Sequence, residues 1–232
     1  LYHETVGDSL FEIPGTYPLL PEEVQPRIKL ATDILEDIVG HKVVSWRCPR
    51  LFGGTHVTNA LEALGYECDA TYPMYFYNEQ LFSYHPSQEN WTEQGSLNLI
   101  EIIQFADMGM ESKDEYGRDK DQWPLYRTQS TEALIPHIES FMSYLEKNDQ
   151  SQKPIVLCFY FHPWEFWEMP EGVIHFGEGG VLPDPFLTKG CGKYCLNQVE
   201  LLIDWLKSKE AAFLTAGQCA RKWHEILALQ EI

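Results

Sequence analysis

Apolar residues follow two periods along this chain, and the two alternate. Apolar positions three or four residues apart, bounded by capping residues or glycine, predict helices over 21–39, 55–64, 131–147, 194–208 and from a capping box at 215–218 onward. Short β-branched and aromatic runs between them predict strands over 42–46, 67–70, 99–103, 154–161 and 211–214. This alternation is typical of a mostly parallel sheet or barrel, and we expect a single α/β domain over residues 1–232.

Polar side chains stand at the ends of four predicted strands, namely Arg47, Asp69, Glu101 and His162. Because active sites gather at the C-terminal ends of parallel strands, this coincidence favours an enzyme. His162 is the most informative of the four, since Pro163 stops the strand directly after it and imidazole exchanges protons near neutral pH. A histidine that merely bonds to backbone at a strand end is the alternative for this position.

Long segments rich in proline, glycine or charge separate several of these elements. We expect irregular structure in four of them: 4–20, 72–98, 104–130 and 163–193. Aromatic side chains are frequent in 72–91 and 164–167. Such rings either stack on sugar faces or pack their own loops down, and the sequence leaves both interpretations open.

Composition supports a folded globular protein and argues against two classes of partner. Hydrophobic residues make up 44% and aromatic residues 13% of the 232 residues, which is enough for a sizeable core. The formal net charge of −18 repels nucleic acids and anionic membranes, and no apolar run approaches the roughly 20 residues that span a bilayer. We therefore expect neither nucleic acid nor membrane as a partner, and a homo-oligomer stays open.

The six cysteines are scattered, and several lie in apolar runs. This pattern is typical of buried thiols in a reducing compartment rather than of a disulfide scaffold, so we expect a cytoplasmic protein. Cys191 and Cys195 form the one close pair in the sequence. A zinc site there would need two more ligands nearby, and the distant His175 is the one candidate, so the pair is better explained as ordinary thiols.

Three short motifs resemble those of one enzyme superfamily. Leu-Tyr-His-Glu at 1–4, Arg-Cys-Pro at 47–49 and Phe-His-Pro-Trp-Glu at 161–165 are similar to motifs of the polysaccharide deacetylase (NodB-like) superfamily, also called carbohydrate esterase family 4. The resemblance implies a distorted (β/α) barrel, incomplete at the N-terminus because its first strand or strands are missing. The reaction it implies is the hydrolysis of a non-peptide carbon–nitrogen bond, namely metal-dependent removal of an N-acetyl group from a saccharide.

The resemblance assigns catalytic roles to residues of these motifs. His162 is similar to the family's general acid, which protonates the leaving amine. Arg47 is similar to the arginine that positions the catalytic base. We expect Asp69 to be the carboxylate partner that orients the imidazole of His162, ahead of Glu101 and Glu165.

Substrate contacts are expected from Pro49, Tyr160 and Trp164. Tyr160 takes the place of the family's apolar pocket residue beside the acetyl methyl group, and its larger ring would suit a smaller acyl group or another substrate. Judged without the resemblance, Arg47 is also compatible with a buried structural ion pair, and Asp69 with a cap or turn.

The same resemblance implies a divalent metal ion, with zinc as the expected metal. The family binds it with an aspartate of an Asp-Asp motif and two histidines of a His-x-x-x-His motif. His3 is similar to the second histidine, and the first would precede it by four residues, upstream of Leu1. We expect the Asp-Asp motif, which includes the general base, further upstream.

Two alternatives accompany the deacetylase interpretation. An allantoinase-like hydrolase of cyclic amides, from the same superfamily, is indicated if small polar amides react and N-acetyl sugars do not. A non-catalytic carbohydrate-binding relative is indicated if the upstream ligands do not exist. Its aromatic loops would then bind glycans, and replacing His162 with alanine would change nothing.

Overall fold

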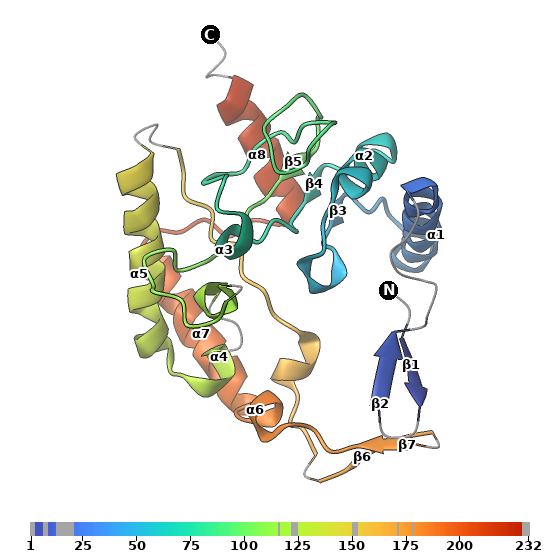
Figure 1. The fold of residues 1–232 in the computed structure, drawn as a ribbon. Coiled ribbons are helices and arrows are strands. Elements are labelled where there is room, and N and C mark those ends of the chain that lie inside the picture. The colour runs from blue at the N-terminus through green and yellow to red at the C-terminus, as the bar shows by residue number, and fades with distance from the viewer. Residues whose placement is uncertain are drawn as a thin grey trace. The chain divides into compact units, whose positions relative to one another are not determined.

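The structure is a computed structural model that describes residues 3–6, 9–12, 21–115, 117–121, 125–149, 153–170, 172–177 and 179–228 (Figure 1). The chain divides into two compact units. The sheet unit comprises residues 20–121, 140–159 and 213–232. The hairpin unit comprises residues 1–19, 122–139 and 160–212. The single domain expected over 1–232 stays a prediction.

The sheet unit contains a three-stranded parallel sheet in the order β3–β4–β5 (Figure 1). Its strands are β3 (Ser45–Trp46), β4 (Cys68–Asp69) and β5 (Ile100–Glu101). Each lies within a run for which the sequence predicts a strand, so these three predictions are confirmed, although the strands are shorter than expected. Parallel pairing places the C-terminal ends of all three at one edge of the sheet.

The last helix, α8 (Ala216–Ala228), packs against β4 and β5. Ala220 and Trp223 are buried in an apolar cluster with residues of these two strands. The predicted capping box at its start is present: the N–H of Thr215 donates to Gln218 Oε1 at 2.9 Å, and the N–H of Gln218 donates to Thr215 Oγ1 at 3.2 Å. The sequence therefore predicted both the position and the start of this helix correctly.

Two further helices of the sheet unit form a second cluster. These are α1 (Pro21–Val39) and α2 (Thr55–Ala63), which contact each other. Ile28 of α1 and Leu61 of α2 are buried together with Leu99, the residue before β5. Both helices begin and end within one residue of the predicted bounds, because their apolar stripes are regular and glycine follows each C-terminus.

The sheet unit also contains short helical turns. The short helix α3 (Met74–Tyr77) and the 3₁₀ turn η2 (Arg118–Asp121) lie in segments for which irregular structure is predicted. The 3₁₀ turn η1 (Pro49–Leu51) lies between the strand predicted over 42–46 and the helix predicted over 55–64. Such single turns carry no long apolar period, which is why a periodicity argument does not find them.

Two antiparallel hairpins give the hairpin unit its name. They are formed by β1 (His3–Val6) with β2 (Ser9–Glu12), and by β6 (Ile174–Phe176) with β7 (Gly179–Val181). Both lie in segments for which the sequence predicts irregular structure, so that prediction was wrong at these positions. Strands of three or four residues show too little alternation to stand out, and two of the three residues of β7 are glycine.

Helices make up most of the rest of the hairpin unit. They are α4 (Leu125–Thr128), the turn η3 (Pro163–Phe166), α6 (Pro185–Thr188) and α7 (Lys193–Ser208). A longer helix, α5 (Thr131–Asn148), has its first residues in this unit and its last residues in the sheet unit. Both α5 and α7 confirm helices predicted from the sequence.

Two predicted strands are wrong. Residues 153–162 and 211–214 have no regular secondary structure. In the first segment Cys158 O accepts one hydrogen bond, from the N–H of Phe105 at 2.9 Å, and the ring of Phe159 lies 5.4 Å from that of Phe105. An apolar run indicates burial, but a strand also needs a continuous ladder of hydrogen bonds with a neighbour.

In the described part of the chain, the strands form one sheet of three and two sheets of two. Helices and small sheets are thus mixed, and the barrel implied by the resemblance stays a prediction. None of the described helices combines the length and apolar character that crossing a membrane requires.

Candidate functional site

The parallel sheet brings Trp46, Asp69 and Glu101 side by side, because Asp69 is the register partner of both other residues. Asp69 and Glu101 end β4 and β5, and both are 0% exposed. Arg47 directly follows Trp46 and therefore lies at the same edge of the sheet. Three of the four polar strand ends predicted from the sequence are thus neighbours in the sheet unit.

The carboxylate of Asp69 is held by a short chain of hydrogen bonds. The hydroxyl of Thr71 donates to Asp69 Oδ1, and the N–H of Cys48 donates to Thr71 Oγ1 at 2.9 Å. Asp69 Oδ2 has no hydrogen-bond partner among the described residues. One oxygen of this carboxyl group is therefore hydrogen-bonded, while the other is buried and receives no hydrogen bond from a described residue.

Glu101 shows the same asymmetry. Its Oε1 accepts the N–H groups of Thr71 at 3.2 Å and of Tyr72 at 2.7 Å, whereas no described group bonds to Oε2. Gln104 lies nearby, 2% exposed, and its Nε2 donates to Ala70 O. Gln104 Oε1 is a third buried acceptor without a partner in the described part of the chain.

Arg47 ties two distant segments to this edge of the sheet. Its Nε donates to Ala70 O at 2.9 Å, which belongs to the residue after β4. Its Nη1 donates to Phe159 O at 3.3 Å and its Nη2 to Cys158 Sγ at 3.0 Å. The guanidinium thus connects the carboxylate edge to the segment that leads towards residue 162.

Burial and charge shift the pKa values of both carboxyl groups. Burial raises the pKa of Asp69 to about 7, against the lowering effects of the Thr71 hydroxyl and the Arg47 charge. Burial, followed by the neighbouring charge of Asp69, raises the pKa of Glu101 well above its ordinary value. Carboxyl groups with pKa values raised in this way are suited to exchanging protons near neutral pH.

His162 lies in the hairpin unit, at the N-terminal end of η3. Its ring is close to two aromatic rings: that of Tyr160 is 4.9 Å away between centroids, and that of Trp164 is 5.5 Å away and nearly parallel, at 20°. Its backbone N–H donates to Glu165 Oε1 at 2.8 Å. The three predicted residues Tyr160, His162 and Trp164 are therefore neighbours in this unit.

A buried ion pair supports this histidine. Glu165 is 1% exposed, and its Oε2 lies 3.2 Å from Arg127 Nε. Arg127 is also buried, lies over the ring of Trp164 at 5.1 Å, and donates through Nη1 to Lys189 O at 3.3 Å. Glu165 therefore accepts a hydrogen bond from the backbone of His162 and pairs with the guanidinium of Arg127. Sequence reasoning missed Arg127, because it lies in the segment 104–130 with no motif around it.

The remaining predicted residues are less informative. Pro49 begins η1 directly after Cys48 and is exposed. His3 lies in β1, but its side chain is outside what the structure describes. The predicted bond between Asp69 and His162 would join the two units and stays a prediction.

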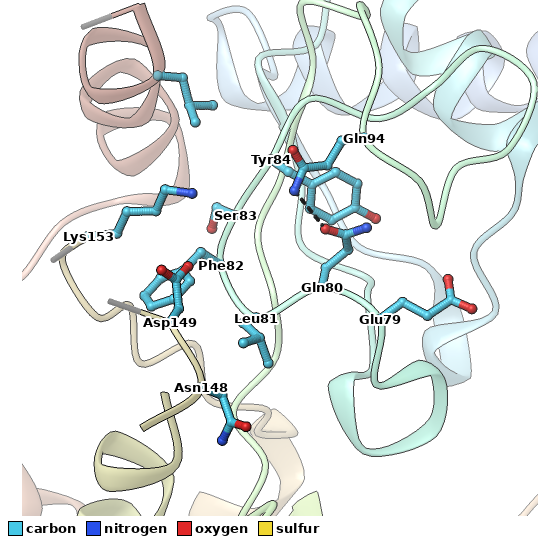
Figure 2. Close-up of a pocket in the computed structure, with 11 residues that line it drawn as sticks. Glu79, Gln80, Leu81, Phe82, Ser83, Tyr84, Gln94, Asn148, Asp149 and Lys153 are labelled. Atoms are coloured by element: carbon cyan, nitrogen blue, oxygen red, sulfur yellow. Dashed lines mark hydrogen bonds between the residues drawn. The ribbon is translucent and has the colours of Figure 1, made fainter. Parts of the chain in front are cut away.

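A pocket of about 210 Å³ also lies in the sheet unit (Figure 2). Figure 2 shows Gln94 Nε2 donating to Gln80 Oε1, at 3.0 Å, along its wall. The ammonium of Lys153 lies 5.7 Å from the centre of the Phe82 ring. None of the site residues predicted from the sequence lines this pocket.

The described residues do not provide a metal site. Among the residues that the structure describes, no three or more histidine, cysteine, aspartate or glutamate side chains are grouped as metal ligands. The resemblance had placed most ligands upstream of Leu1, with His3 as the one ligand within the chain. The divalent metal thus stays a prediction.

Comparison with known proteins found no match: no protein-family model, no curated protein and no solved structure is similar to this chain. The resemblance to polysaccharide deacetylases therefore depends on sequence motifs alone, chiefly those at 1–4, 47–49 and 161–165.

Proposed function

We propose that this protein is a hydrolase of non-peptide carbon–nitrogen bonds, which removes an N-acetyl group from a saccharide. The observation that carries the proposal is the edge of the parallel sheet, where Arg47 lies beside the buried carboxyl groups of Asp69 and Glu101. Ionisable groups with perturbed pKa values at the C-terminal ends of parallel strands favour an active site. The motif around His162, by its resemblance to the deacetylases, adds the reaction class.

In this proposal His162 gives a proton to the amine as it leaves. The neighbouring rings of Tyr160 and Trp164 offer apolar faces to a sugar close to the imidazole. Glu165 accepts the backbone N–H of His162 and so holds the main chain that carries the imidazole. Asp69 is the proposed carboxylate partner of the imidazole. The positive charge of Arg47 offsets part of the negative charge of Asp69.

The resemblance also implies a divalent metal ion, with zinc expected and His3 as one ligand. Because the described residues do not complete such a site, no step here depends on it. The net charge of −18 suits a neutral or cationic saccharide or another small amide better than an anionic substrate. A cytoplasmic location is part of the same proposal.

The test is an assay of acetate and free amine released from N-acetylglucosamine oligomers, with added Zn²⁺. We expect release by the wild-type protein and a loss of turnover on the order of 10² or more for His162→Ala, with little change in substrate binding. His56→Ala, at an exposed position on α2, is the matched control and should keep full activity. Equal activity of both variants would contradict the role of His162.

The same samples separate the alternatives. Ring opening of a cyclic amide such as allantoin, without acetate release from sugars, would replace the proposal with a cyclic-amide hydrolase. Binding of the oligomers without any turnover, unchanged in His162→Ala, would replace it with a carbohydrate-binding protein.

A further inference from the structure

Asp69 and Glu101 are register partners on adjacent parallel strands. Neighbouring strands lie about 4.8 Å apart, and register partners project to the same side of a sheet. The two carboxyl groups are therefore within reach of each other. Both are 0% exposed, so that bulk solvent does not reach them to screen their charges.

Only one oxygen of each carboxyl group accepts a hydrogen bond from the described residues. The hydroxyl of Thr71 donates to Asp69 Oδ1, and the N–H groups of Thr71 and Tyr72 donate to Glu101 Oε1. Asp69 Oδ2 and Glu101 Oε2 receive no hydrogen bond from these residues. Two ionised carboxylates buried in this way would be strongly unfavourable, because no described group donates a hydrogen bond to Asp69 Oδ2 or Glu101 Oε2. A proton placed between those two oxygens satisfies both.

The charges around the pair also indicate that the two carboxyl groups hold one proton. Arg47 is the cation whose charge acts on Asp69, and one cation balances one of two negative charges. Among the described residues, the other titratable groups that act on the pair are thiols and phenols whose pKa values burial raises: Cys48, Cys68, Tyr72, Tyr84 and Cys158. These groups are neutral near pH 7 and bring no positive charge, so the second negative charge is removed by a proton.

We infer that Asp69 and Glu101 share one proton and act as a single acid–base unit, in which Glu101 is the positioning residue for Asp69. The proton is bound to either Asp69 Oδ2 or Glu101 Oε2 and is donated in a hydrogen bond to the other of these two oxygens. When Asp69 loses the proton, Glu101 Oε2 takes it up, so the charge of the buried pair does not change. The raised pKa of Glu101 agrees with its holding this proton.

The catalytic meaning of this pair rests on the proposed function. If Asp69 passes its proton to Glu101, it becomes negatively charged when the proposed imidazole partner becomes positively charged. The total charge of the Asp69–Glu101 pair does not change in this step. The pairing itself is a property of the folded protein and is measurable without substrate.

The first measurement is stability between pH 5 and pH 9 for the wild type, Glu101→Gln and the control Asp37→Asn, which changes an exposed carboxylate on α1. Raised pKa values in the folded state mean that stability is greatest in acid and is lost as pH rises through those values. Glutamine resembles the protonated acid. Relative to the wild type, the unfolding equilibrium of Glu101→Gln should therefore shift towards the folded state by on the order of tenfold between pH 5 and pH 9.

A second measurement uses the wild-type protein and does not depend on whether a variant folds. Infrared absorption of the wild-type protein should show a protonated carboxyl group at pH 7 that disappears at higher pH. A difference between Glu101→Gln and wild type that is constant from pH 5 to pH 9, or no protonated carboxyl band at pH 7, would overturn the shared proton. If both signals are present but the wild type releases no acetate, the shared proton stands and the proposed function fails.

Discussion

Glu165 and Arg127 form an ion pair in the interior of the hairpin unit, with 3.2 Å between Oε2 and Nε and with side chains that are 1% and 0% exposed. The other carboxylate oxygen of Glu165 accepts the backbone N–H of His162. One buried carboxylate therefore links a cation to the residue that is the proposed general acid.

Replacing Arg127 with methionine should destabilise the protein strongly. The change leaves the charge of Glu165 buried without its partner, which typically costs about 3–5 kcal/mol. Urea unfolding measures the loss. Arg118→Met is the control, because Arg118 pairs with Asp114 at the surface, with side chains 62% and 26% exposed, and such pairs contribute about 1 kcal/mol or less. Similar losses in both variants would contradict a structural role for the buried pair.

Gly190→Ala should be far more harmful than Gly172→Ala. Both glycines have left-handed backbone, with φ of +69° and +81°, so alanine is strained at either position by about 1–2 kcal/mol. A Cβ at Gly190 would also overlap the carbonyl oxygen of Arg127, whereas a Cβ at Gly172 meets nothing within 4 Å. Thermal melting compares the two variants. Equal shifts in Tm would show that the chain around Arg127 gives way without cost.

His224 should make the protein less stable below pH 6.5. Burial and the neighbouring His85, whose ring centroid is 4.9 Å away, lower the pKa of His224 from its ordinary 6.5. A lowered pKa in the folded state means that stability is present above pH 6.5 and is lost as pH falls through the folded value. NMR titration measures that pKa directly. His85→Gln should raise it, while His41→Gln, at an exposed position after α1, should leave it unchanged.

Cys48 and Cys68 should resist alkylation in the folded protein. Burial raises the pKa of each thiol to about 12, and the thiolate is the reactive form. Mass spectrometry after iodoacetamide treatment at pH 8 should find Cys191, which is partly exposed, modified before either of them. Unfolding in urea should expose all six thiols. Labelling of Cys68 as fast as that of Cys191 in the native state would show that this part of the sheet opens.

The helices were predictable because their signals are local. The capping box at Thr215, the glycine after α1 and the apolar stripes of α5 and α7 are each read within one or two turns of chain. The hairpins β1–β2 and β6–β7 were not predictable, because short strands depend on pairing. The run at 154–161 shows the converse: its apolar residues predicted a strand, but no ladder forms along it.

The candidate site was predictable in part. Arg47 and Asp69 were expected at strand ends, and the sheet places them at one edge together with Glu101. The importance of Glu101 did not follow from sequence, because it depends on the register that sets it opposite Asp69. Arg127 was missed for a related reason: its partner Glu165 is 38 residues away, and no local pattern indicates which cation neutralises a buried acid.

The hydrogen bonds of Arg47 also bear on the order in which the protein is assembled. Its partners Cys158 and Phe159 follow it by 111 and 112 residues. During synthesis the ribosome therefore releases β3, β4 and β5 long before the guanidinium can reach those partners. Contacts of such sequence separation form late, since a long loop must close first. A nascent chain that ends before residue 158 can build the strands and their carboxylates, but the arginine at their edge gains its last partners only when the later segment arrives.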